Sequence, residues 1–318
     1  MPSVARYLSF AIVVALAAVC AYLLRADLAH VSFEPVARAW DVVALACVLS
    51  LLNYLVRIIR WRQYLARLGH VLPFSFTAVT YVAGFAFTVS PGKVGEVARA
   101  RYYSPLGIRV TDVAGAFFVE RLLDLLAMLV LATLILAAAP RYQGAAWMAA
   151  GAGSLCLAAL LLLPWNAIGQ RLGGSKRIPR RLALLCCAGV AALSAARALL
   201  TPKVLLGGLL FSLLAWGFEG VGLWTLGGLI PDSHVSLAVG VGIYAVAVSV
   251  GALSFMPGGL GGTEVIMTAL LASQGLSVAD ALLITIVCRL VTLWLAVLLG
   301  WIAVAVLRQG LVAAPASW

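Results

Sequence analysis

Long runs of apolar residues are the feature that most constrains what this chain can fold into. Leu122–Ala139 and Leu290–Leu307 are two examples, each close to the roughly 20 residues that a helix needs to cross a bilayer. Only 10% of the 318 residues are charged, against about 25% in a soluble domain. A chain with so little polar surface would not stay dissolved in water, and we therefore expect lipid to be its solvent.

Lipid leaves few choices for the backbone, because every buried N–H and C=O group needs an internal partner, as in helices or a closed barrel. Barrel strands would give short alternating segments, which these long runs do not resemble. We therefore predict an all-α polytopic membrane protein with a single membrane domain over residues 1–318. The apolar runs cover approximately residues 5–24, 41–59, 74–90, 113–139, 145–164, 182–201, 203–230, 236–256 and 279–307.

Two of the shorter runs, 74–90 and 236–256, end in clusters of proline and glycine. Both residue types interrupt a helix, and an interruption within the membrane is tolerated only where protein or a water-filled cavity covers it. We therefore predict two broken, re-entrant hairpins. The break residues are Pro91, Gly92 and Gly95 in the first, and Pro257, Gly258, Gly259, Gly261 and Gly262 in the second.

The two breaks belong to an internal repeat with an offset of 168 residues. This offset places the segment 107–112 on 275–280, both with the pattern Gly-x-x-Val-x-Asp. The same offset pairs Glu96 with Glu264, and Arg121 with Arg289. Chance pairing of charged residues is improbable in a chain so poor in them, so we predict repeats at about 74–139 and 236–307.

The distribution of basic residues predicts the orientation. Segments 57–73 and 165–181 carry Arg and Lys without any acid, which is typical of the cytoplasmic side. With both termini inside, the hairpins enter from opposite faces, giving about six full spans and an inverted repeat, an architecture common among transporters. This scheme requires 182–201 to lie along the cytoplasmic surface, because a crossing there would make the repeats parallel. The expected location is the cytoplasmic (inner) membrane of a bacterium.

Charged residues inside spans are costly and usually face a partner or a cavity. We expect Arg121 and Arg289 to approach the midplane from opposite sides, with Glu96 and Glu264 each beginning a helix after its break. Two interpretations remain open: structural Glu–Arg pairs that fix each hairpin, or a positive cavity for an anionic headgroup, since Arg binds phosphate bidentately and keeps its charge.

Further charged residues have less certain roles. Lys93 in the first break is either a headgroup contact or a side chain that extends to the interface. Asp124 lies one turn beyond Arg121 and could pair with it, while Glu120 is a weaker candidate for a proton relay. The group Arg57, Arg60 and Trp61 is interpreted first as an interfacial anchor and second as a lipid-phosphate contact, and Glu219 as a packed acid.

Other function classes find no support. The six cysteines lie in apolar runs without a metal-ligand pattern, and no P-loop, nucleophile elbow or zinc-protease motif occurs. We therefore expect no metal, no cofactor, no catalytic residue and no enzyme activity. The net charge of +11 fits the positive-inside bias or attraction to anionic lipid, and nucleic-acid binding is not expected.

The break motifs resemble those of a known family. Pro91–Glu96 followed by Glu120-Arg121, and Pro257–Glu264 with Arg289, are similar to the two signatures of the lysylphosphatidylglycerol synthase transmembrane-region family, also called flippase-like. The resemblance implies a stand-alone member that lacks the soluble synthase domain. In fused members the membrane region moves an aminoacylated phospholipid between leaflets, so the resemblance implies lipid translocation without naming the lipid.

The leading hypothesis is thus a flippase or transporter for a phospholipid or a lipid-linked substrate, such as a polyprenyl phosphate or a glycolipid. The alternatives are an intramembrane enzyme, with Glu96, Glu120 and Asp124 as general bases, or a scaffold in lipid or lipid-linked glycan synthesis. The expected ligand is a membrane lipid with an anionic headgroup. A second copy of the chain or a pathway enzyme remains open as a protein partner.

Overall fold

The computed structural model describes residues 31–136, 151, 154–155, 157–173, 180–231, 233–254 and 256–311. Every regular element in these ranges is a helix, which confirms the predicted all-α class for the described part of the chain. The predicted first span, 5–24, and much of 145–164 lie outside the described residues.

Three helices among the described residues are long and apolar enough to cross a membrane. They are α4 (Trp40–Arg67), α11 (Pro202–Gly227) and the continuous stretch Val278–Arg308, in which α14 (Val278–Arg289) passes through the π-helix η5 (Leu290–Trp294) into α15 (Leu295–Arg308). The helix α7 (Val110–Leu136) is just as long but carries charged residues in its middle. These four helices agree with predicted spans.

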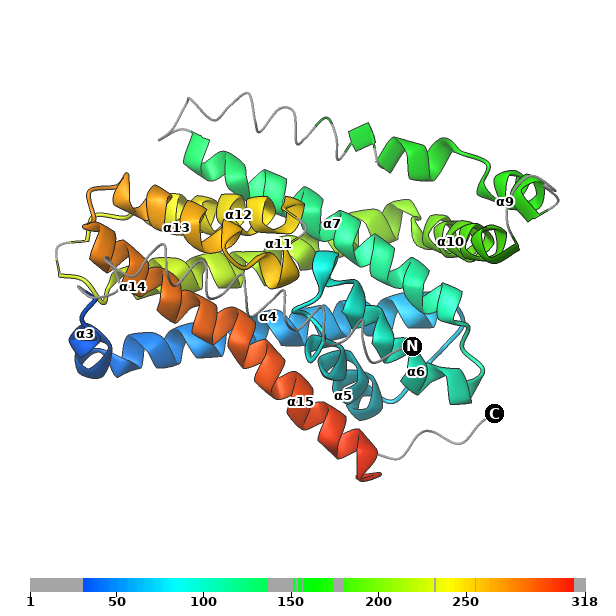
Figure 1. The fold of residues 1–318 in the computed structure, drawn as a ribbon, viewed down its shortest axis with the longest axis horizontal. Helices are drawn as coiled ribbons and strands as arrows, with labels where there is room; N and C mark the ends of the chain where they lie inside the picture. The colour runs from blue at the N-terminus through cyan, green and yellow to red at the C-terminus, as the bar shows by residue number, and fades with distance from the viewer. Residues whose placement is uncertain are drawn as a thin grey trace.

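The helices α4 and α11 run antiparallel and form one side of the core (Figure 1). Polar contacts between them fix this direction, because residue numbers rise along α4 while their partners' numbers fall along α11. These contacts pair Ser50 with Glu219, Asn53 with the carbonyl of Ala215, and Arg60 with Ser212. Consequently the end of α4 and the end of α11 lie at opposite ends of the molecule.

The first hairpin begins just after α4. It consists of α5 (Phe74–Phe85), the 3-10 stretch η1 (Pro91–Arg99) and the short α6 (Ala100–Tyr103), followed by η2 (Ser104–Leu106) and α7. The run 74–90 therefore stops being α-helical at Phe85, five residues before its apolar character ends. The chain turns back at the predicted break.

The second hairpin follows α11 and so enters from the opposite end (Figure 1). It consists of α12 (Leu237–Leu253), the single turn η4 (Pro257–Gly259) and α13 (Gly262–Ala272). Gly258, Gly259 and Gly261 have φ values of 63°, 69° and 84°, a region that side chains with a Cβ rarely adopt. The glycine cluster is therefore a backbone requirement of this turn.

The offset of the repeat reappears in the backbone. Gly107 and Gly275 both have positive φ, 76° and 93°, and the following long helices begin at Val110 and Val278. The two breaks meet in the interior, where η1 packs against η4. Each hairpin thus brings its break to the middle of the molecule from its own end.

The first hairpin also packs tightly against the last helix. A Cβ on Gly300 of α15 would collide with the backbone nitrogen of Ala86, just beyond α5. Only glycine permits this approach, and α5 and α15 lie side by side over much of their length.

The remaining described helices are α3 (Glu34–Arg38), α9 (Trp165–Gly173) and α10 (Arg180–Leu199). α10 packs against the first half of α7, where Gly115 meets the backbone of Ala192, and lies at the end of the molecule where α11 begins (Figure 1). This placement agrees with a helix that does not cross, but the interfacial location of 182–201 stays a prediction.

Candidate functional site

Glu120 lies at the centre of the charged interior. Its side chain is fully buried and accepts hydrogen bonds from Arg60 at 3.1 Å and Arg99 at 2.8 Å, and one from the Tyr81 hydroxyl. Nη2 atoms of Arg57 and Arg121 approach it to 3.6 and 3.3 Å. One carboxylate is thus surrounded by four guanidinium groups from α4, η1 and α7.

Asp124, one turn further along α7, is the second acid of this cluster. It pairs with Arg60 at 2.7 Å and with Arg121 at 3.1 Å, and accepts a hydrogen bond from Ser212. The predicted Asp124–Arg121 pair is therefore present. Among these four arginines and two acids, positive charges exceed negative ones by two, which attracts an anion in a low-dielectric interior.

Aromatic rings pack against the buried guanidinium groups. The Arg99 guanidinium lies 3.6 Å from the ring centroid of Trp61 and 4.5 Å from that of Tyr81. Arg57 faces the rings of Phe85 and Trp216 at 5.3 and 5.6 Å. Cation–π attraction strengthens when the cation is desolvated, so these rings help to hold buried charge.

The second half of the repeat contains a simpler pair. Arg289 donates through Nε to Glu264 at 2.7 Å and through Nη2 to the carbonyl of Gly258 at 2.7 Å. Glu264 also accepts a hydrogen bond from the N–H of Gly261, which caps α13. The predicted helix start at Glu264 and its pairing with Arg289 are both present. Through these contacts Arg289 links α14 to the second break.

The first half does not repeat this geometry. Glu96 lies inside the 3-10 stretch η1 and not at the start of an α-helix, and its carboxylate accepts a hydrogen bond from Thr88 at 2.9 Å. Arg121 pairs with Glu120 and Asp124 instead. The interpretation as structural Glu–Arg pairs is therefore wrong for Glu96 and Arg121, while the pair Glu264–Arg289 is present. The Lys93 side chain lies outside the described part of the structure.

The interfacial-anchor interpretation of the α4 arginines is also wrong. Arg57 and Arg60 are buried, and so is Trp61, which donates to Tyr103. A polar stripe was the missed signal: Ser50, Asn53, Arg57 and Arg60 recur at helical spacing on one face of α4, and all four are buried. Such a stripe in an apolar helix indicates a polar partner inside the protein.

A cavity of about 380 Å³, here called the outer cavity, brings the two predicted arginines together. Arg121 and Asp124 of α7 line it on one side, and Arg289 lines it with Gly258 and Gly259 of the second break. The rest of its wall is mostly apolar and comes largely from α7 and α12, including Leu125, Met128, Val248, Ala252, Leu253 and Met256. Its volume is typical of a small-molecule site.

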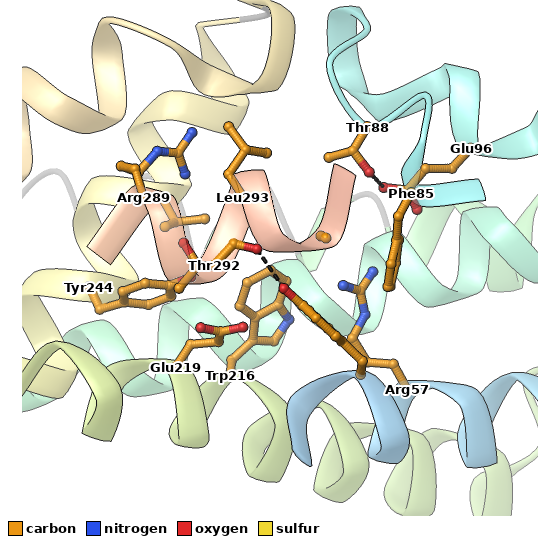
Figure 2. A pocket seen from close by; sticks show the side chains of 13 residues that line it. Arg57, Phe85, Thr88, Glu96, Trp216, Glu219, Tyr244, Arg289, Thr292 and Leu293 are labelled. Carbon is orange, nitrogen blue, oxygen red and sulfur yellow. Dashed lines mark hydrogen bonds between the residues drawn. The ribbon is translucent and has the colours of Figure 1, made fainter. Parts of the chain in front are cut away.

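A second space, here called the inner cavity and drawn in Figure 2, shares the lining residues Trp216, Val248 and Arg289 with it. It holds only about 40 Å³ and has a mixed polar and aromatic lining. The residues with polar side-chain groups that line it are Tyr54, Arg57, Thr88, Glu96, Trp216, Glu219, Tyr244, Arg289 and Thr292. The described residues contain no cluster of three or more His, Cys, Asp or Glu able to hold a metal.

Taken together, the apolar helices, the two broken hairpins and the buried arginine cluster define a helical membrane protein with a charged interior. The chain belongs to the family described as the lysylphosphatidylglycerol synthase TM region, whose model matches residues 8–300. It is similar to the UPF0104 membrane protein PH1989 of Pyrococcus horikoshii, with 33% identity over 108 residues. That match covers 33% of this chain and 31% of the relative's length.

Proposed function

We propose that this protein moves a lipid with an anionic, phosphate-bearing headgroup between the leaflets of the cytoplasmic membrane. The observation that carries the proposal is the outer cavity, lined by Arg121 from one half of the repeat and Arg289 from the other. A guanidinium group binds phosphate in a bidentate fork. The apolar remainder of the wall suits the part of the lipid next to its headgroup.

We propose that the two hairpins, each with the long helix that follows it, form an inverted repeat. Motion of one repeat against the other would then give alternating access. The shared offset of Gly107 and Gly275, and the entry of the hairpins from opposite ends, support the inverted repeat. In this architecture the substrate site lies where the broken helices meet. Both termini would then lie on the cytoplasmic side.

The acids act as internal substitutes for the headgroup when the site is empty. Glu264 accepts the hydrogen bond that Nε of Arg289 donates, and Asp124 forms an ion pair with Arg121. A lipid phosphate would compete for the same guanidinium groups, so its net binding energy would be modest. Moderate affinity suits a transporter, which must also release its substrate.

The test is lipid movement in liposomes that carry labelled anionic and zwitterionic phospholipids and a polyprenyl phosphate. Arg121→Gln and Arg289→Gln should each lower the rate by at least about tenfold, the effect of losing about 1.4 kcal/mol of headgroup binding. Arg289→Lys keeps the charge without the fork and should retain part of the rate. Arg308→Gln, an exposed arginine at the end of α15, is the matched control and should behave as wild type.

The result that would reject the proposal is the absence of protein-dependent movement of any of these lipids, with and without a pH gradient. The intramembrane enzyme and the scaffold would then be the better hypotheses. The buried pairs would in that case be structural.

A further inference from the structure

We infer that the outer and inner cavities are consecutive positions on one path for the anionic headgroup, separated by the indole of Trp216 and sharing Arg289. The inference rests on the proposed function for the nature of the headgroup. It adds a partition residue, and a second arginine, Arg57, beyond the partition.

The shared lining is the first observation. Trp216, Val248 and Arg289 line both cavities, so the two spaces lie back to back across these side chains. Trp216 has the largest side chain of the three and comes from α11. Its removal would join the two spaces more than any other single truncation of this wall.

The sizes of the cavities are the second observation. The outer cavity holds about 380 Å³ and the inner cavity about 40 Å³. A water molecule needs roughly 10–15 Å³ measured in this way, so the inner cavity has room for a few waters and not for a headgroup. A headgroup in the outer cavity can therefore reach Arg57 through this wall only if the partition moves.

The contacts of Trp216 show where it is held. Its ring lies 5.6 Å from the guanidinium carbon of Arg57 and 6.4 Å from the ring centroid of Tyr244, and Figure 2 shows it among the residues that line the inner cavity. An anion that draws Arg57 away from the indole would weaken one of these two contacts. Headgroup and partition thus compete for the same cation.

Beyond the partition, the inner cavity is better suited to transient passage of the headgroup than to stable binding of it. Among the described residues, Nε and Nη2 of Arg57 have no hydrogen-bond partner; Nη2 faces Glu120 at 3.6 Å, which leaves Nε as a donor for the headgroup. Glu96 and Glu219 face the same space and would repel a resident anion. Arg289 lines both cavities and can stay in contact with the headgroup on either side.

The partition is tested by cysteine modification, which does not depend on lipid movement. In the full chain with its six cysteines replaced by alanine, Ser249→Cys reports on the outer cavity and Thr292→Cys on the inner one. The probe is a methanethiosulfonate that carries a sulfonate. A reagent of the same size with a trimethylammonium group measures charge preference.

Trp216→Ala should raise the modification rate of Thr292→Cys by at least about tenfold, because close-packed side chains exclude the reagent from the intact inner cavity. The rate at Ser249→Cys should not change. Trp224→Ala is the matched control, since Trp224 lies two turns further along α11 and is partly exposed. If the alanine variant does not elute as a single species, Trp216→Phe takes its place, with a smaller expected increase.

An equal rate at Thr292→Cys with and without the indole would overturn the partition. A faster reaction of the trimethylammonium reagent at Ser249→Cys would overturn the anionic headgroup. If the indole controls access but wild-type liposomes show no lipid movement, the partition stands and the proposed function fails. If lipid moves but access does not depend on Trp216, the proposed function stands and the partition fails.

Discussion

Four arginines approach the carboxylate of Glu120, and all of them lie within a fully or largely buried cluster. Taking charges out of water costs several kcal/mol each, and that cost is offset only when every charge keeps its partners. Glu120 therefore has a structural role whatever the cavity binds. Glu120, considered from the sequence a weaker candidate for a proton relay, has the most ionic partners in the described structure.

Glu120→Gln should destabilise the protein by about 3–5 kcal/mol, because it leaves buried guanidinium groups without their common counter-charge. The measurement is thermal unfolding of purified protein in detergent. Glu34→Gln removes an acid that also pairs with an arginine, Arg38, but on an exposed helix, and it should leave the unfolding temperature unchanged. Equal effects of the two substitutions would show that the cluster is solvated and not structural.

The sequence predicted the local Asp124–Arg121 pair and, of the two pairs that the repeat suggested, only Glu264–Arg289, and it failed where the partner is distant. Arg121 and Asp124 are three residues apart, and Glu264 and Arg289 follow from the repeat. Arg60 reaches Glu120 across 60 residues of chain, which no local pattern reveals. Position at the end of an apolar run suggested the interface for Arg60, but α4 continues to Arg67, so this residue lies two turns inside the helix.

At the scale of elements, the backbone continues through the two breaks in different ways. The first uses nine residues of 3-10 helix, whereas the second uses a single turn with glycines in left-handed conformations and then resumes as α13. The apolar pattern predicted that both breaks exist. It did not predict this difference, because the pattern of Pro and Gly marks where a helix stops and does not specify how the chain continues.

Gly259→Ala should destabilise the protein by about 1–3 kcal/mol, since its φ of 69° is strained for any L side chain and its Cβ would lie 2.8 Å from Oγ1 of Thr263. Gly217→Ala is the matched substitution, and we expect it to change the stability in the opposite direction. Gly217 lies inside α11 with nothing near its Cβ position, so alanine should stabilise the helix by about 0.5–1 kcal/mol. Unfolding of the two variants under the same detergent conditions checks both, and a stabilising Gly259→Ala would contradict the backbone requirement.

At the scale of the whole molecule, the antiparallel pairing of α4 and α11 determines that the hairpins enter from opposite ends. The basic loops predict which end of each long helix is cytoplasmic, because positive charge is retained on that side, and this orientation stays a prediction. The meeting of the two breaks could be expected only from the repeat. The packing that closes them together depends on contacts between residues far apart in sequence.

The proposed membrane orientation predicts which loops are accessible. In a cysteine-free chain, Ser233→Cys, in the turn after α11, should react with a membrane-impermeant maleimide in intact cells. His70→Cys, in the loop after α4, should react only after the membrane is permeabilised. Labelling of both from the same side would contradict the entry of the hairpins from opposite faces.

The contact between Gly300 and Ala86 has a mechanical consequence. α15 is continuous with the helix that carries Arg289, and Ala86 lies just beyond α5, which leads into the first break. Because the two backbones pack directly against each other with no side chain between them, a displacement of α5 would move α15 by a similar amount. In the proposed alternating access, a tilt of the first hairpin would therefore carry the helix that bears Arg289 with it.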